Sequence, residues 1–261
     1  MTERDIEFAA AVLWRNWQES LRIRELPERC RPVDRAEGYA IQAKLAEISG
    51  QALTGWKIAA TSRAGQAHIA VDGPLAGRLL EKRVLGDGST ISLKGNLMRV
   101  AEAEFAFRFA HDLKKRSQPY SPDEVMNAVE SLHAAIEVPD SRYEDYTTVG
   151  APQLIADDAC ACWFILGEPA EPRWRDFELA HHRVEGYRNG EHVSSGVGSN
   201  VLGDPRLALT WIANELSVYG DGLLAGQVVT TGTCLTPIPV TAGDHVSMDY
   251  GAFGAVEARF C

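Results

Sequence analysis

The chain has 261 residues, of which 45% are hydrophobic and 24% charged, a composition typical of a folded globular protein that needs no disulfide or metal to fold. Its formal net charge of −10 argues against a nucleic-acid-binding surface, which is normally basic. The N-terminus is acidic and lacks a basic segment followed by an apolar core, so we expect no signal peptide. No apolar run approaches membrane-spanning length, so we also expect no membrane association.

Two helices are expected in the first fifty residues. The first begins after Thr2, and apolar residues then recur at helical spacing as far as Trp17. After a proline-containing break at 26–34, the second helix begins at Asp34 and ends near Gly50. This N-terminal part is predicted to be mainly helical.

From residue 54 onward the pattern changes to short strands with two helices between them. The helices are predicted at 121–132 and 204–220, where Ser121 and Asp204 are suitable N-caps, each followed by proline. The strands are predicted at 54–60, 77–85, 90–93, 99–110, 132–138, 161–167, a hairpin over 184–196, 226–233, 245–251 and 255–260. The sequence therefore predicts an α+β fold, with a helical region and first strand at 1–75 packed on a β-rich body at 76–261.

The five cysteines are odd in number and include no CxxC motif. Cys160 and Cys162 fall within a strand-like run, where buried, reduced thiols are expected. Reduced thiols are typical of a cytoplasmic protein, so we expect a cytoplasmic location.

The segment "RVAEAEFAFRFA" (99–110) places two carboxylates side by side. Alternate residues point to one face of a strand, so Glu102 and Glu104 are neighbours, and three phenylalanines occupy the opposite face. The simplest interpretation is a solvated edge, with Arg108 as a charge partner. However, glutamate is uncommon in strands, and a pair on one face also suits a binding site.

Two other predicted strands show the same feature. Glu137 lies on a face of small residues in "LHAAIEV", and Lys57 shares a face with glycine and alanine in "TGWKIAA". Lysine and glutamate are rarely buried without partners. If these faces converge, three carboxylates lie together, and an all-oxygen ligand set suits Mg²⁺ or Mn²⁺ rather than zinc. Periodicity alone leaves the convergence open.

The ordered motifs resemble one known family. The motifs are "GWKIAATS", "AEAEFAF", "AAIEVPDSRY", "IADDACACWFILG", "GDPRLALTWIANEL", "TGT" and "GAFGAVEARF". Their order is similar to the hydratase and decarboxylase branch of the fumarylacetoacetate hydrolase superfamily, from about residue 5 to the C-terminus. The resemblance implies a mixed β-sandwich roll with an N-terminal helical region. It also implies a homo-oligomer, and some hydratases of this branch pair with the decarboxylase of their pathway.

The resemblance also assigns residues to the site. It places the metal ligands at Glu102, Glu104 and Glu137, for Mg²⁺ or Mn²⁺, and the active-site lysine at Lys57. The family segment "ADNAS" corresponds to 156–160, with Asp157 near the substrate. The glycine loop beside the substrate carboxylate corresponds to Thr231, Gly232 and Thr233.

This chain departs from the family pattern beside the lysine strand. Family hydratases carry a segment like "DEPDYG", and here the segment is "VDGPLAG". Asp72, Pro74 and Gly77 match, but Leu75 and Ala76 stand at the acidic and aromatic positions, and the replaced aspartate is a proposed acid/base group in the family. Asp158 and Cys160 likewise replace the asparagine and serine of "ADNAS".

The implied activity is hydration of a 2-hydroxy-2,4-dienoate or 2-oxo-4-enoate to a 4-hydroxy-2-oxo acid, in aromatic-compound catabolism. The metal would stabilise a dienolate, and Lys57 would move a proton if burial lowers its pKa. Asp72 and His68 are the other candidate proton carriers, although Asp72 also suits a turn and His68 an ordinary loop. Arg142 suits a structural ion pair better than a substrate clamp.

Three alternatives remain. They are decarboxylation of a 2-oxo-3-enedioate, carbon–carbon hydrolysis of an acylpyruvate, and a non-catalytic subunit that supports an active partner.

Overall fold

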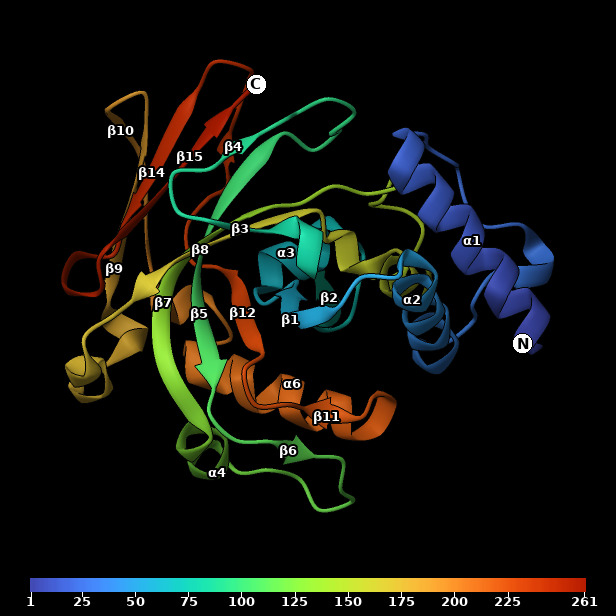
Figure 1. Ribbon diagram of the computed structural model, residues 1–261, viewed down its shortest axis with the longest axis horizontal. Helices are drawn as coiled ribbons and strands as arrows, with labels where there is room; N and C mark the ends of the chain where they lie inside the picture. Colours follow the sequence, from blue (N-terminus) through green and yellow to red (C-terminus); the bar gives the residue numbers. More distant parts are fainter.

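The computed structural model describes residues 1–261 (Figure 1). Its α-helices are α1 (Glu3–Glu19), α2 (Arg35–Ser49), α3 (Arg63–His68), α4 (Pro122–Asn127), α5 (Ala151–Ala156) and α6 (Pro205–Tyr219). Its strands are β1 (Leu53–Ala59), β2 (Leu75–Leu80), β3 (Val84–Gly86), β4 (Thr90–Ile91), β5 (Val100–Phe109), β6 (Leu113–Lys114), β7 (Val129–Val138), β8 (Trp163–Pro169), β9 (Arg183–Arg188), β10 (Glu191–Val197), β11 (Gly222–Leu223), β12 (Val228–Thr233), β13 (Ile238–Pro239), β14 (His245–Asp249) and β15 (Ala255–Phe260). None of the helices combines the length and apolar character needed to cross a bilayer.

The larger sheet has eight strands and carries the candidate site. Seven strands run in the order β2-β1-β12-β5-β7-β8-β3, and β13 pairs with the start of β5. β1 is parallel to β12 and β3 is parallel to β8, whereas the other neighbours are antiparallel. This mixed sheet thus joins β1, from the N-terminal quarter of the chain, to strands near the C-terminus.

The outer face of this sheet packs against a second sheet in the order β10-β9-β14-β15-β4. Phe105, Phe107 and Phe109 of β5 lie in the main hydrophobic core of 48 buried residues, together with Val256 of β15. The alternation predicted for β5 is therefore confirmed, because its phenylalanine face is the core face.

The inner face of the larger sheet curls around itself. Five of its strands each contribute one residue to a small buried cluster: Leu79, Ala106, Ala135, Phe164 and Val228. A flat sheet would not bring β2 and β8 together, because four strands separate them. This cluster fills one end of the space inside the curled sheet. Glu102, Glu104 and Glu137 lie farther along β5 and β7, on the same faces as Ala106 and Ala135.

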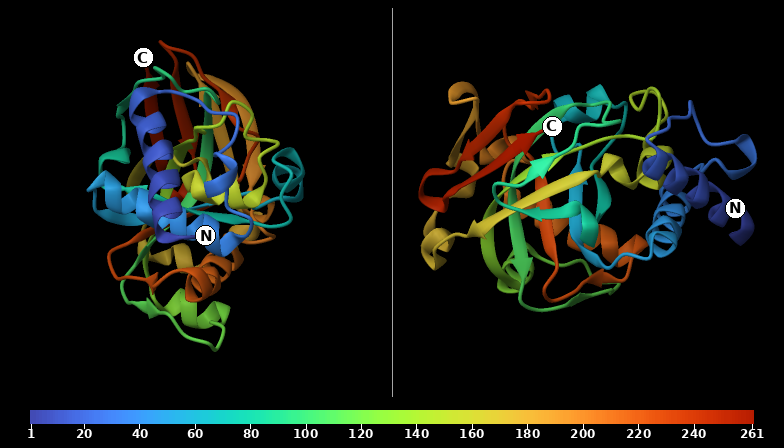
Figure 2. Two further views of the ribbon diagram at one scale, coloured as in Figure 1. Left: turned by 90° about the vertical axis from the view of Figure 1, so that its right-hand side faces the viewer. Right: turned by 45° about the horizontal axis from the view of Figure 1, so that its top comes forward.

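The N-terminal helices lie at the opposite end of the molecule from the smaller sheet (Figures 1 and 2). α1 and α2 contribute half of a second cluster of 12 buried residues, which joins Leu13, Trp17 and Leu45 of these helices to Leu80 and Tyr143 of the body. Their predicted caps are present, since Thr2 and Asp34 accept hydrogen bonds from the first-turn amides of Asp5 and Glu37. A division of the chain at residue 75 stays a prediction; β1, on its N-terminal side, pairs with β2 and β12 of the body.

Three expectations for local structure are wrong. The helix predicted at 121–132 ends at Asn127, because the chain from Val129 pairs with β5 and sheet pairing outweighs local helix propensity. The strand predicted at 77–85 is two strands, joined by a 3₁₀ turn and paired with different neighbours. The chain after residue 54 also holds α3 and α5, two short helices in addition to the two that were predicted there.

Candidate active site

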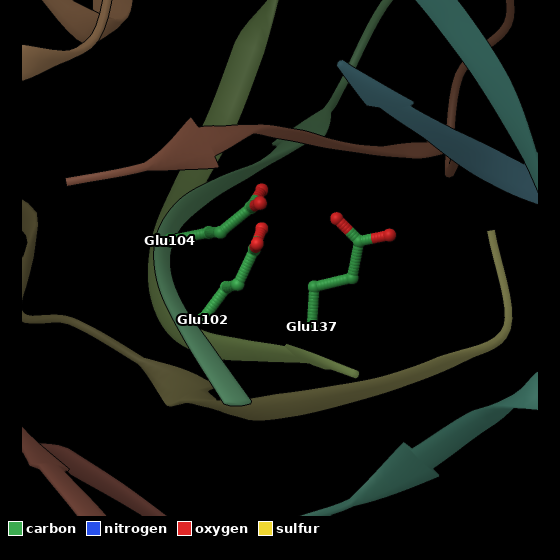
Figure 3. A group of neighbouring side chains, drawn as sticks. All are labelled: Glu102, Glu104 and Glu137. Carbon is green, nitrogen blue, oxygen red and sulfur yellow. The ribbon is translucent and has the colours of Figure 1, made fainter. Parts of the chain in front are cut away.

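The three glutamates converge on one point at the inner face of the sheet. Glu102 pairs directly with Glu137 across β5 and β7, and Glu104 is the next residue on the same face. One carboxylate oxygen from each lies within 4.8 Å of the other two. Figure 3 shows the three side chains directed into a common space from these two adjacent strands. The convergence that the sequence left open is therefore present.

Two of these carboxylate oxygens are buried without a hydrogen-bond donor: one oxygen of Glu104 and Oε2 of Glu137. Oε1 of Glu137 has the Lys57 ammonium as its neighbour. The other Glu104 oxygen accepts hydrogen bonds from the Thr230 hydroxyl and from the Gly232 amide, at 2.8 Å for the amide. Buried carboxylate oxygens normally have partners, so this set of free oxygens fits a hard divalent cation.

Lys57 completes the cluster. Its side chain is 3% exposed, and Nζ lies 3.0 Å from Oε1 of Glu137 in a buried ion pair. Nζ also donates a hydrogen bond of 3.0 Å to the carbonyl oxygen of Ala159. β1 thus supplies the single ammonium group that faces the three carboxylates.

Burial and the repulsion from neighbouring carboxylates make Glu102 and Glu104 reluctant to ionise. Burial, with the charge of Glu137, raises the pKa of Glu102 to about 7 and that of Glu104 well above its usual value. Burial lowers the pKa of Lys57, but the three carboxylates outweigh burial and raise that pKa above its usual value. The condition for proton transfer, a pKa of Lys57 lowered by burial, is therefore not met in the metal-free cluster, which holds the lysine as an ammonium ion.

The segment 157–160 forms an unusual turn against Lys57. Asp158, Ala159 and Cys160 all have positive φ, at 55°, 49° and 62°, a conformation that costs about 1 kcal/mol or more for each residue. The amide of Arg78 holds the turn by donating a 2.6 Å hydrogen bond to Asp158. The turn directs the Ala159 carbonyl toward Lys57.

Gly77 leaves the space for this turn. A Cβ atom at residue 77 would lie 2.3 Å from the carbonyl oxygen of Asp158 and 3.0 Å from Cδ of Lys57. The glycine that the family pattern shares with this chain therefore allows β2 to approach both the turn and the lysine.

A cavity of about 550 Å³ opens beside the glutamates. Its polar lining includes Lys57, Glu102, Gly232 and Thr233. Its apolar wall consists mainly of Ile69, Leu75, Met98, Leu154, Leu235 and Pro237. His68 and Tyr146 also line it, with the imidazole Nε2 3.4 Å from the phenol oxygen. The sequence pattern gave no indication of Tyr146 or of the helix α3 that carries His68.

Five predicted site residues lie outside this cavity lining: Glu104 and Glu137, which are buried behind Glu102, and three others. Asp72 is exposed, in the loop between α3 and β2. Thr231 is buried and donates its hydroxyl to the Phe105 carbonyl at 3.0 Å. Asp157 is buried, and its carboxylate binds the guanidinium of Arg142. The structural ion pair expected for Arg142 is therefore confirmed. The catalytic role of Asp72 and the substrate-binding roles of Thr231 and Asp157 stay predictions.

The fold and the cavity together define a class of protein: an enzyme built on a mixed β-sandwich roll, with a buried acidic cluster on the wall of a small-molecule cavity. Residues 70–261 match the family model described as fumarylacetoacetate (FAA) hydrolase C-terminal. The chain belongs to this family, which confirms the fold and the branch that the motif order predicted.

Relatives in this family are similar over nearly the whole chain. The 2-keto-4-pentenoate hydratase 1 of Dechloromonas aromatica (strain RCB) is 33% identical and covers 97% of this chain and 96% of its own. The 2-oxo-hept-4-ene-1,7-dioate hydratase of Escherichia coli is 33% identical over 86% of each. The 4-oxalocrotonate decarboxylase of Pseudomonas putida G7, solved with magnesium and adipate, is 27% identical, with a TM-score of 0.89 over 100% of this chain and 99% of its own.

Asp158 gives a prediction for stability. Burial raises its pKa to about 6 from the usual 3.8, so the folded protein disfavours the ionised form. Wild-type stability should therefore fall as the pH rises from about 4 to above 6. Asp158→Asn, which keeps the acceptor for the Arg78 amide, should be more stable than wild type at pH 8, by about 2 kcal/mol, and by less at pH 5. Urea denaturation at both pH values measures this, with the exposed Asp221→Asn as control. An equal effect at both pH values would contradict the prediction.

Proposed function

We propose that this protein is a divalent-metal-dependent hydratase. It adds water to a 2-hydroxy-2,4-dienoate or 2-oxo-4-enoate and gives a 4-hydroxy-2-oxo acid, in aromatic-compound catabolism. The observation that carries the proposal is the group of three converging glutamates, with oxygens free of donors, at a cavity beside a buried lysine. The full-length similarity to hydratases supports the same reaction.

Glu102, Glu104 and Glu137 would hold the cation. A ligand set of three carboxylates, without a nitrogen or sulfur ligand, suits Mg²⁺ best and Mn²⁺ next. The similar decarboxylase structures contain magnesium or calcium, which prefer the same ligands. When bound, the ion supplies Lewis acidity toward adjacent oxygens of an enol or 2-oxo acid.

The residues of the chain would orient the substrate and move its protons. The Lys57 ammonium is fixed by Glu137 and Ala159, so it is placed to donate to an oxygen of the substrate and to hold a proton there. Gly232 and Thr233, on the cavity wall, would contact the substrate carboxylate. The apolar wall would contact the hydrocarbon part of the dienoate and exclude bulk solvent, apart from the one water molecule that adds to the substrate. Asp72 stays a predicted proton carrier that the static cavity does not include.

Decarboxylation of a 2-oxo-3-enedioate is the second candidate function. Leu75 supports it, because this fully buried cavity residue stands where the resemblance places the acid/base aspartate of hydratases. The similarity of the whole fold to 4-oxalocrotonate decarboxylase also supports it. Both reactions pass through an enolate, so the same carboxylate cluster would serve either.

Activity assays with the purified protein and Mg²⁺ would separate the two functions. We expect 2-hydroxypenta-2,4-dienoate to be consumed and 4-hydroxy-2-oxopentanoate to form, with loss of activity on addition of EDTA. Release of CO₂ from a 2-oxo-3-enedioate, without hydration of the dienoate, would establish the second function instead. Absence of both reactions, and of carbon–carbon cleavage of an acylpyruvate, would favour a non-catalytic subunit. The implied homo-oligomer and the complex with a pathway enzyme stay predictions, which light scattering of the protein alone and with that enzyme would test.

The cavity also predicts a preference for substrates with one carboxylate. Lys57 is the single lysine or arginine of the lining, and Glu137 already pairs with it. A second carboxylate on the apolar wall would lose hydration without gaining a cation, at a cost of a few kcal/mol. We expect kcat/KM for 2-hydroxypenta-2,4-dienoate to exceed that for 2-oxohept-4-ene-1,7-dioate by about 100-fold. Met98→Lys should narrow the ratio, and a preference of the wild type for the dioate would contradict the prediction.

A further inference from the structure

A second cavity lies where the end of α1 meets the β-rich body. It has a volume of about 150 Å³ and is separate from the cavity beside the glutamates. Five segments of the chain line it: the end of α1, the turn after β2, the loop after β4, the segment after β7, and the start of β8. The segment after β7 lies between the two cavities, since Pro139 lines the first and Asp140 the second.

The lining of this second cavity is strongly basic. It contains four cationic side chains and one carboxylate: Arg22, Arg83, Lys94 and Arg142 against Asp140. Arg22 pairs with Asp140 at 2.5 Å, and Arg142 pairs with Asp157 behind the cavity. Arg83 and Lys94 pair with no carboxylate, so the lining has an excess of two positive charges.

Two further hydrogen-bond donors around this cavity have no acceptor. The indole Nε1 of Trp17 and the guanidinium Nε of Arg22 are buried, and each lacks a partner. The carboxylate of Asp140 already accepts from Arg22 and from the Leu97 amide, so it has little capacity for them. Buried donors are rarely unpaired, and an excess of donors over acceptors complements an anion.

Aromatic rings fix the unpaired guanidinium in place. The Arg83 Cζ lies 4.4 Å from the ring centre of Trp163 and 5.2 Å from that of Trp17. The Arg142 Cζ lies 4.2 Å from the same Trp17 ring. Stacking on an indole holds a guanidinium by its faces and leaves its N–H edge available for a planar or tetrahedral oxyanion.

From this arrangement we infer that the second cavity is a binding site for a small oxyanion, of the sulfate, phosphate or short carboxylate type. Arg83 and Lys94 supply the charge, and Trp17 and Arg22 supply further N–H donors. Because the donors come from α1 and from the body, the bound anion links the N-terminal helices to the sheet. The Mg²⁺-loaded enzyme should therefore melt at a higher temperature when the site is filled.

Isothermal titration calorimetry of the Mg²⁺-loaded protein with sodium sulfate tests the site, with sodium chloride holding the ionic strength constant. We expect saturable binding of one sulfate per chain and a rise in melting temperature that chloride does not produce. Parallel titrations with phosphate and acetate identify the preferred anion, tetrahedral or planar. Absence of saturable binding for all three anions would overturn the inference and would indicate that water satisfies these donors.

Substitutions of residues that line the second cavity test whether sulfate binds there. Arg83→Met should weaken sulfate binding at least tenfold, and Lys94→Gln, at an exposed residue that folding does not require, should weaken it severalfold. Lys82→Gln is the matched control, because Lys82 is the exposed neighbour of Arg83 and does not line the cavity. Glu102→Gln should leave sulfate affinity unchanged, which separates this site from the glutamate cluster. Unchanged affinity in both Arg83→Met and Lys94→Gln would contradict the assignment.

Discussion

Glu104→Gln should weaken divalent-metal binding by at least about 100-fold and reduce kcat/KM by about 1,000-fold. The substitution keeps the acceptor for the Thr230 hydroxyl and the Gly232 amide, so the local structure is retained. It removes one negative charge from the three that would hold the ion. Calorimetric titration with Mg²⁺ and assays over a range of Mg²⁺ concentrations measure the two effects.

The same variant has a second expected effect, which a merely structural glutamate would not show. Burial and the neighbouring carboxylates raise the pKa of Glu104, so its ionised form destabilises the metal-free fold at neutral pH. In EDTA, Glu104→Gln should therefore melt above wild type, whereas added Mg²⁺ should stabilise wild type much more than the variant. Glu130→Gln, an exposed glutamate on β7, is the control. Equal stabilisation of Glu104→Gln and wild type by Mg²⁺ would exclude Glu104 as a ligand.

Arg142→Met should lower the free energy of unfolding by about 3–5 kcal/mol, which corresponds to roughly 10 °C in melting temperature for a chain of this size. Arg142 is 1% exposed, and it donates to the carboxylate of Asp157 and, at 2.8 Å each, to the carbonyls of Asp140 and Ala161. Methionine fills a similar volume but leaves the Asp157 carboxylate buried without its cation. Thermal and urea denaturation measure the loss.

A double variant tests the cause of that loss. Burial raises the pKa of Asp157, and the charge of Arg142 opposes this rise. In the Arg142→Met background, Asp157→Asn should therefore recover part of the lost stability by removing the unpaired charge. The exposed pair of Arg15 and Glu19 provides the control, because Arg15→Met should cost less than about 0.5 kcal/mol. A loss below 1 kcal/mol for Arg142→Met would show that the buried pair contributes little to stability.

The sequence predicted the strands and helices whose signals are local. Alternation over 99–110 identified which face of β5 is core and which carries Glu102 and Glu104, because successive residues of a strand point to opposite faces. Caps and prolines located α1, α2 and α6, because first-turn amides need acceptors that adjacent residues supply. Motif order identified the family and the candidate ligands.

The sequence by itself thus determined the α+β class, the core face of β5 and the residue types available for a metal. Only the tertiary structure decided that Glu137 pairs opposite Glu102 and that Lys57 faces both, because register between distant strands depends on sheet pairing rather than on local pattern. It also ended the predicted helix at Asn127, because the chain pairs with β5 from Val129 onward. The left-handed turn at 158–160 and the apolar wall around Leu75 arise in the same way, since each depends on contacts between segments far apart in the chain.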